Sequence, residues 1–297
     1  MANRLFADAL TRTLLFDGGM GTSLLARGLD LQQMPPEAWL RDRPDDVRAV
    51  HAAFADAGAD VLQTNSFGLL RLARAGTSPG DPADLAARSV RLAAGLGPLV
   101  VASLGPSGPP GADPGWLADH VERLAHAFAD AGAHALHLET CCDPTELSAL
   151  LRGAARGPLP LCVSMTVSLG QTGLETPLGV PLARMLRTVE ESADLPAVIG
   201  VNCSLPARRQ RRSVAELREW ADRLRVPQPP RVLVQPQIDE PAPDCKRPPI
   251  PETPARFAAD LWTLHQDGAD LLGGCCGCRP DHIAAARQTR DAARAAS

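Results

Sequence analysis

Eight short apolar runs recur along this chain, and longer helical patterns separate most of them. Each run is brief, largely apolar, and soon followed by Gly, Pro, Ser, Thr or Cys, which is the pattern of strands buried on both faces of a parallel sheet. The predicted strands are Leu14–Asp17, Val61–Thr64, Leu99–Ser103, Ala135–Glu139, Leu161–Met165, Ala197–Asn202, Arg231–Gln235 and Asp270–Leu272.

The intervening segments carry apolar residues at helical spacing. The helices predicted from this spacing are Pro44–Ala57, Trp116–Ala131, Pro181–Glu191, Ser213–Leu224, Thr253–Gln266 and Pro280–Ala295. Ser213 and Glu216 have the spacing of a capping box, and Pro181 and Pro280 suit the first helical turn. The glycines of Ala57–Asp60, Ala131–His134 and Asp267–Asp270 suit left-handed helix caps before the next strand.

Eight strand–helix units in 297 residues match the size of a (β/α)8 TIM barrel, and we expect one domain over residues 1–297. The alternative is an open, doubly wound sheet, which would need a dinucleotide-type glycine loop after its first strand. The segment Asp17–Thr22 is rich in glycine but lacks that spacing, so the barrel is favoured.

Composition argues against several classes of protein. A net charge of -4 gives no basic footprint for nucleic acid, and the one dense basic run, Arg208–Arg212, reads as an exposed loop entering a helix. Eight cysteines are too few for a disulfide scaffold in a chain of this length. No apolar run approaches the roughly 18 residues of a membrane span. We therefore expect a cytoplasmic protein that binds neither nucleic acid nor membrane.

Cysteines follow two of the predicted strands. Cys275 and Cys276 lie in the run Gly273–Cys278 after the eighth strand, and Cys203 follows the sixth. The ends of these strands meet at one mouth of a barrel, with a single strand between them. Three thiolates and one open position describe a catalytic zinc site, so the pattern indicates that chemistry.

Several motifs occur in an order that resembles the zinc-dependent homocysteine S-methyltransferase family. They are Asp17–Thr22, Thr64–Phe67, Glu139-Thr140, Gly200–Ser204 and Gly273–Gly277. The resemblance implies a TIM barrel, a Zn²⁺ ion held by Cys203, Cys275 and Cys276, and methyl transfer to homocysteine to give methionine. Cys141, Cys142, Cys162, Cys245 and Cys278 have no such support as ligands.

An amino-acid substrate also needs partners for its ammonium and carboxylate groups. By resemblance, Glu139 and Asp17 receive the ammonium, and backbone N–H groups around Gly18 and Gly19 suit the carboxylate. The remaining candidates for substrate contact are polar residues near the ends of strands: Thr64, Asn65, Ser164 and Asn202. His51, His126 and His137 read as packing positions.

The methyl donor is less constrained by the sequence. Only 3% of residues are aromatic, which disfavours betaine relative to S-methylmethionine, S-adenosylmethionine or a methyl-corrinoid partner protein. Trp39, Trp116 and Phe67 are the aromatic candidates near the mouth. The seventh strand continues as Gln235–Glu240, where many family members carry a Pro-Asn-Ala/Ser-Gly-like segment. That departure leaves open a partner-dependent or non-catalytic homocysteine- and zinc-binding subunit, and another thiol or selenol acceptor is a further alternative.

Overall fold

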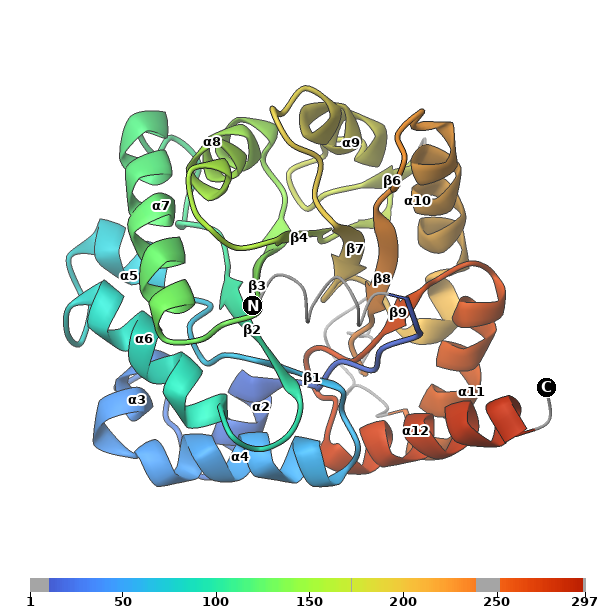
Figure 1. Ribbon diagram of the computed structural model, residues 1–297, viewed down its shortest axis with the longest axis horizontal. Helices are drawn as coiled ribbons and strands as arrows, with labels where there is room; N and C mark the ends of the chain where they lie inside the picture. The colour runs from blue at the N-terminus through green and yellow to red at the C-terminus, as the bar shows by residue number, and fades with distance from the viewer. Residues whose placement is uncertain (1–10, 172, 239–251, 296–297) are drawn as a thin grey trace.

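A ring of parallel strands forms the centre of the protein, and helices surround it (Figure 1). The computed structural model describes residues 11–171, 173–238 and 252–295. The strands are hydrogen-bonded in the order β1 (Val61–Gln63), β2 (Leu99–Leu104), β3 (Ala135–Cys141), β4 (Leu161–Met165), β7 (Val198–Asn202), β8 (Arg231–Gln235) and β9 (Leu271–Leu272). A small antiparallel hairpin, β5 (Ser168–Leu169) and β6 (Leu174–Glu175), is inserted between β4 and β7.

The segment predicted as the first strand closes this ring. Leu15 forms a parallel bridge with Leu272 of β9, and Phe16 forms one with Val61 of β1. The amide of Phe16 donates to the Leu272 carbonyl at 2.7 Å, and the amide of Asp17 donates to the Val61 carbonyl at 3.0 Å. The TIM-barrel prediction is thereby confirmed, and the open doubly wound alternative is excluded.

The helices begin at sites that the sequence marks clearly. They are α2 (Met20–Leu25), α3 (Trp39–Asp42), α4 (Pro44–Asp56), α5 (Leu69–Ala75), α6 (Pro82–Ala93), α7 (Pro114–Asp130), α8 (Pro144–Ala155), α9 (Leu182–Glu190), α10 (Arg211–Arg223), α11 (Pro254–Gln266) and α12 (Pro280–Ala295), with 3-10 turns η1 (Pro36–Ala38) and η2 (Ala207–Arg209). The side chains of Asp81, Asp113, Asp143 and Thr253 accept backbone N–H groups just before a first-turn proline. This pairing satisfies helix-end donors and presets the backbone angle of the first turn.

Two expectations about helices need correction. The capping box at Ser213 is wrong, because α10 starts at Arg211 and Ser213 is a buried residue inside it. Pro181 is the N-cap of α9 rather than its first residue. Helices α5, α6 and α8 were not predicted, although Asp-Pro pairs announce two of them.

The barrel interior is built in layers, because alternate residues of each strand face inward. The layer farther from the carboxyl ends of the strands is an apolar cluster of Leu14, Phe16, Val61, Val101, Ala135, Cys162, Val198, Leu233 and Leu271. Two residues further along several strands, the inward positions become polar: Gln63, Ser103, His137, Ser164 and Gln235. The interior therefore changes from apolar to polar towards the carboxyl ends of the strands.

Three turns with a shared sequence fix the opposite end of the barrel. Gly58, Gly132 and Gly268 have φ of 95°, 98° and 116°, as predicted for left-handed caps. Two residues after each glycine, Asp60, His134 and Asp270 accept the backbone N–H of Leu15, Val100 and Val232, each on the preceding strand or the closing segment. Each turn thus satisfies an amide near the start of a neighbouring strand.

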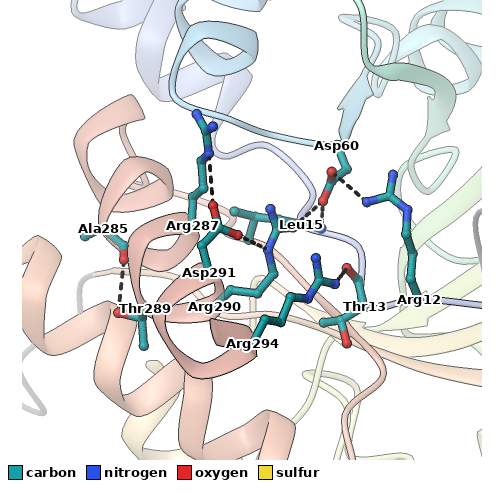
Figure 2. A network of polar contacts seen from close by, with 10 residues as sticks. All are labelled: Arg12, Thr13, Leu15, Asp60, Ala285, Arg287, Thr289, Arg290, Asp291 and Arg294. Atoms are coloured by element: carbon teal, nitrogen blue, oxygen red, sulfur yellow. Dashed lines mark hydrogen bonds and ion pairs between the residues drawn. The ribbon is translucent and has the colours of Figure 1, made fainter. Parts of the chain in front are cut away.

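Asp60 also joins the last helix to the closing segment (Figure 2). Its carboxylate receives Arg290 of α12 and Arg12, in addition to the amide of Leu15. The side chain of Arg290 is only 8% exposed, so this ion pair lies largely out of solvent. Among the described helices, none is long and apolar enough to cross a membrane.

Candidate metal and substrate site

Three cysteine sulfurs meet at the carboxyl end of the barrel. Sγ atoms of Cys203, Cys275 and Cys276 lie within 4.8 Å of one another, and those of Cys203 and Cys276 are 3.0 Å apart. The cysteines follow β7 and β9, which are separated by β8 alone, as the sequence predicted.

The end of β8 and the residues that follow it form backbone hydrogen bonds with both cysteine loops. The amide of Cys203 donates to the Gln235 carbonyl at 3.2 Å, and the amide of Cys275 donates to the Pro236 carbonyl at 2.9 Å. The amide of Ile238 donates to the Cys276 carbonyl at 2.9 Å. The segment that departs from the family pattern therefore positions all three thiols through its backbone.

Glycines around the thiols are required mainly for space. A Cβ at Gly274 would lie 2.2 Å from Sγ of Cys278, and a Cβ at Gly273 would lie 2.7 Å from Cβ of Phe16. Neither glycine has a positive φ, so the requirement for glycine at these two positions is steric rather than conformational. Cys278 is fully buried beneath this loop, consistent with its exclusion as a ligand.

The thiol cluster fits a soft, tetrahedrally coordinated metal. Three sulfurs about 2.3 Å from a zinc ion at tetrahedral angles would lie about 3.8 Å apart, and the three sulfurs of the cluster all lie within 4.8 Å of one another. Without a metal, hydrogen bonds from Cys203 and Cys275 lower the pKa of Cys276 to about 3, so the cluster already supports one thiolate. Within the described chain, no other group of His, Cys, Asp and Glu has this geometry.

A cavity of about 370 Å³ opens beside the sulfurs. Its wall combines the glycine-rich loop after the closing segment, the ends of β1 to β3, and the cysteine loops. The lining residues used below are Gly18, Gly19, Glu37, Gln63, Thr64, Asn65, Phe67, Ser103, Glu139, Gln235 and the three cysteines.

Glu139, one of the two carboxylates predicted to receive the ammonium group, lines the cavity. Oε1 accepts from Gln63 at 3.1 Å and from the hydroxyl of Ser103, and Oε2 accepts from Asn202 at 2.8 Å. Burial raises the pKa of Glu139 to about 7 despite these donors. A ligand cation would favour its ionised form.

Asn202 is buried and does not line the cavity. Its amide binds Glu139 and, at both ends, Thr140: Nδ2 donates to Oγ1 at 2.9 Å, and Oδ1 accepts the backbone N–H at 2.8 Å. Thr140 has φ of 60° and Cys203 has φ of 47°, a backbone region that costs non-glycine residues energy. Asn202 therefore holds a strained backbone and a carboxylate together.

Gln63 connects both predicted substrate acids. Its side chain donates to Glu139, and its backbone N–H donates to Oδ2 of Asp17 at 2.9 Å. Asp17 is 1% exposed and does not line the cavity, and Oδ1 has no hydrogen-bond partner among the described residues. Burial raises the pKa of Asp17 well above its ordinary value.

The other predicted contacts divide into two groups. Thr64 and Asn65 line the cavity, where Thr64 bonds to Ser66 at 2.6 Å and Asn65 donates to the Pro36 carbonyl at 2.9 Å. Ser164 lies deeper and contacts Nε2 of His137 at 2.8 Å.

The glycine-rich loop offers fewer free donors than predicted. Gly18 and Gly19 line the cavity, but the amide of Gly19 is already bonded to the Cys278 carbonyl at 3.0 Å. Of the three aromatic candidates, Phe67 alone lines the cavity. Trp39 is buried, and Trp116 stacks on His120.

Sequence reasoning missed Gln63 and Gln235, and it treated His137 as a packing residue. His137 is indeed fully buried, but its ring bonds to Gln63 at 3.1 Å as well as to Ser164. The alternation of side chains along a strand could have identified these residues. Gln63, His137 and Gln235 each lie two residues beyond an inward-facing apolar residue, so they also face the barrel interior. Cys245 lies outside the described residues.

A family model described as Homocysteine S-methyltransferase matches residues 14–290. Methionine synthase of Mycobacterium leprae is 30% identical over 300 residues that include 92% of this chain and 24% of the relative. This chain thus spans about a quarter of that protein's length. Homocysteine S-methyltransferase YbgG of Bacillus subtilis is 26% identical over 307 residues, covering 91% of this chain and 92% of YbgG.

Solved structures support the same architecture. The metallated form of the homocysteine methyltransferase MmuM from Escherichia coli superposes with a TM-score of 0.71 at 23% identity. The match covers 97% of this chain and 99% of MmuM, so the two folds correspond along nearly their whole length.

Proposed function

This chain belongs to the homocysteine S-methyltransferase family, and on that premise we propose that it methylates homocysteine to give methionine. The observation that carries the proposal is the arrangement of three thiol sulfurs and a carboxylate on one cavity wall. Thiols that bind a metal suit the activation of a thiol substrate, and Glu139 suits the ammonium of an amino acid.

We propose zinc as the metal and Cys203, Cys275 and Cys276 as its ligands. Zinc prefers tetrahedral sulfur sites, and catalytic sites have three protein ligands and one open position. Zinc at this position would lower the pKa of an incoming thiol, so that homocysteine is present as its thiolate at neutral pH.

The surrounding residues would orient that substrate. Glu139 would receive the ammonium group, while Gln63, Ser103 and Asn202 hold its two oxygens in place. Thr64, Asn65 and the loop at Gly18 and Gly19 line the same cavity and would contact the rest of the substrate. Asp17 and Ser164 would act behind this wall, because neither lines the cavity.

In the transfer itself, one bond to the methyl carbon forms and another bond to the same carbon breaks. The substrate sulfur donates an electron pair to the methyl carbon of the donor, and the bond from that carbon to its leaving group breaks with its electron pair. No proton is needed from the protein at this step, so neither of the two glutamates that line the cavity, Glu37 and Glu139, has to act as a general acid.

A donor screen tests the proposal. Metal-loaded protein is incubated with homocysteine and, separately, S-methylmethionine, S-adenosylmethionine and methylcobalamin, and methionine is quantified. Formation of methionine from at least one donor is expected. Absence of methionine with every donor, in protein that binds both zinc and homocysteine, would instead favour a binding subunit.

Metal analysis tests the ligand set separately. Cys203→Ala should lose most of the bound zinc, whereas Cys142→Ser should retain it, because Cys142 is half-buried and outside the thiol cluster. Unchanged zinc stoichiometry in Cys203→Ala would refute the assignment.

A further inference from the structure

Cys203 is the one proposed zinc ligand that lies on a loop of its own. Cys275 and Cys276 are adjacent and follow β9, whereas Cys203 follows β7. Its backbone φ is 47°, in the left-handed region that costs a residue with a Cβ conformational energy. A residue persists in that region only when its surroundings fix it, so the turn of residues 202–204, here called the Cys203 turn, needs partners that hold it.

Two hydroxyl groups hold the Cys203 turn. Oγ of Ser204 donates to the carbonyl of Asn202 at 2.9 Å, and Oγ1 of Thr166 donates to the carbonyl of Cys203 at 3.0 Å. A hydroxyl has a single proton, so each is committed to one carbonyl. These carbonyls belong to the peptide groups on either side of the Cys203 Cα, whose rotations define its φ and ψ. The strained residue is therefore fixed from both sides.

The residues that reach the turn come directly from the barrel. Thr166 and Val167 follow β4, the neighbour of β7. The backbone N–H of Val167 donates to Oγ of Ser204 at 2.8 Å, so this hydroxyl accepts from one loop while it donates within the other. Thr166 is buried, and its own N–H donates to the carbonyl of Cys141, the last residue of β3, at 3.3 Å. The Cys203 turn is thus connected to two strands besides its own.

We propose that Thr166 and Ser204 are positioning residues for the metal, because they hold the Cys203 turn in the conformation that directs its sulfur at the other two thiols. The inference rests on the proposed zinc site and adds to it two residues that are not ligands. Neither residue lines the cavity, so each acts through Cys203 rather than by contact with a substrate there.

Release of the turn would cost the site part of its affinity for metal. If φ of Cys203 relaxed to the negative values that most residues prefer, the direction of its Cα–Cβ bond would change, and its sulfur would leave the cluster. Zinc binding would then require the strained conformation to be restored. Side chains that orient metal ligands typically change metal affinity by roughly 10- to 100-fold when they are removed.

A purely structural role predicts a different result from a positioning role. Loss of a hydrogen bond that only stabilises the fold lowers the free energy of unfolding but leaves the zinc affinity of the folded protein unchanged. Loss of a positioning group weakens zinc binding by protein that is still folded. Zinc dissociation constants are therefore measured by competition with a chromophoric chelator, after circular dichroism has shown that each metal-free variant is folded.

Four variants separate the two roles. Thr166→Val removes one hydroxyl with little change of shape, Thr166→Ser keeps it, and Ser204→Ala removes the other. Thr188→Val is the matched control, because Thr188 on α9 is also a buried threonine whose hydroxyl donates to a backbone carbonyl, that of Arg184 at 3.2 Å. The zinc dissociation constant should rise by about tenfold or more in Thr166→Val and in Ser204→Ala. Thr166→Ser and Thr188→Val should bind zinc as tightly as wild type.

Wild-type zinc affinity in folded Thr166→Val and Ser204→Ala would overturn the role given to the two hydroxyls, and so would equal weakening in Thr166→Val and Thr188→Val. If Ser204→Ala does not fold without metal, the comparison of Thr166→Val with Thr166→Ser decides alone. A wild-type protein that binds no zinc would refute the zinc site and this inference together, whereas zinc binding that none of the variants changes would refute the inference alone.

Discussion

Nδ2 of Asn202 lies 2.8 Å from Oε2 of Glu139, so a residue at the end of β7 fixes a carboxylate on β3, across the intervening β4. The same amide is bonded at both ends to Thr140, whose backbone is left-handed. One side chain therefore stabilises an unfavourable backbone conformation and aims the proposed ammonium partner.

Replacing Asn202 should weaken both functions. In Asn202→Ala, Glu139 loses a donor and Thr140 loses two partners, so we expect a stability loss of about 1–3 kcal/mol and at least about a tenfold fall in kcat/KM. Denaturant unfolding and steady-state kinetics measure the two effects. Zinc content should stay the same, and a variant with wild-type kcat/KM would show that Glu139 is oriented without Asn202.

Glu139 should make the metal-free protein less stable as the pH rises. Its folded-state pKa of about 7 exceeds the ordinary value of 4.5, because burial penalises the charged carboxylate. The folded state therefore binds more protons than the unfolded state between about pH 4.5 and pH 7. Stability from this group is fully present below about pH 4.5, falls as the pH rises through about 7, and then levels off.

Glu139→Gln removes that titration. Relative to wild type, this variant should become more stable by about 1–3 kcal/mol between pH 5 and pH 8, measured by urea unfolding of metal-free protein. A difference that stays constant with pH would contradict the raised pKa.

Gly274→Ala should disturb the metal loop through space alone. Its new Cβ would lie 2.2 Å from Sγ and 2.5 Å from Cβ of Cys278, whose side chain is fully buried. We expect a loss of about 1–3 kcal/mol in the free energy of unfolding and weaker zinc binding in a chelator competition. Gly21→Ala is the matched control, since no atom lies within 4 Å of its added Cβ. Equal effects of the two substitutions would rule out a steric origin.

Arg290 should contribute far more to the free energy of unfolding than Arg287, which lies on the same helix, α12. Arg290→Met leaves Asp60 without its least exposed partner, and we expect a loss of about 2–4 kcal/mol. Arg287→Ala breaks a surface ion pair with Asp291 and should cost less than about 1 kcal/mol. Thermal and urea unfolding would compare the two variants, whose ion pairs Figure 2 shows. Similar losses would mean that burial of the Asp60 pair is unimportant.

The strand order and the cysteine cluster could be predicted because both follow from local patterns. Buried parallel strands are continuous apolar runs, and barrel topology brings their carboxyl ends together. Leu14–Asp17 was correctly expected next to the other strands, although it forms bridges rather than a regular ladder.

The polar layer beneath the cavity could not be predicted in the same way. A glutamine near the end of an apolar run, such as Gln63 or Gln235, is compatible with solvent or with a buried network, and only the partners decide. Those partners come from strands distant in sequence: Gln235 and Gln63 are separated by 172 positions. The helix start at Arg211 was missed for a related reason, because Ser213 has a capping sequence but is buried against neighbouring elements.

Closure of the barrel by Leu14–Asp17 has a kinetic consequence. This segment pairs with β1, which is near in sequence, and with β9, which lies close to the other end of the described chain. Contacts of such high sequence separation form slowly, because the entropy cost of closing a long loop comes before the contacts can stabilise the chain. Asp17 and the glycines that follow it reach Cys278 and Gly274 only through that closure. A folding intermediate with the other seven strands paired would therefore still lack an assembled substrate cavity, and recovery of homocysteine binding during refolding should report the last step.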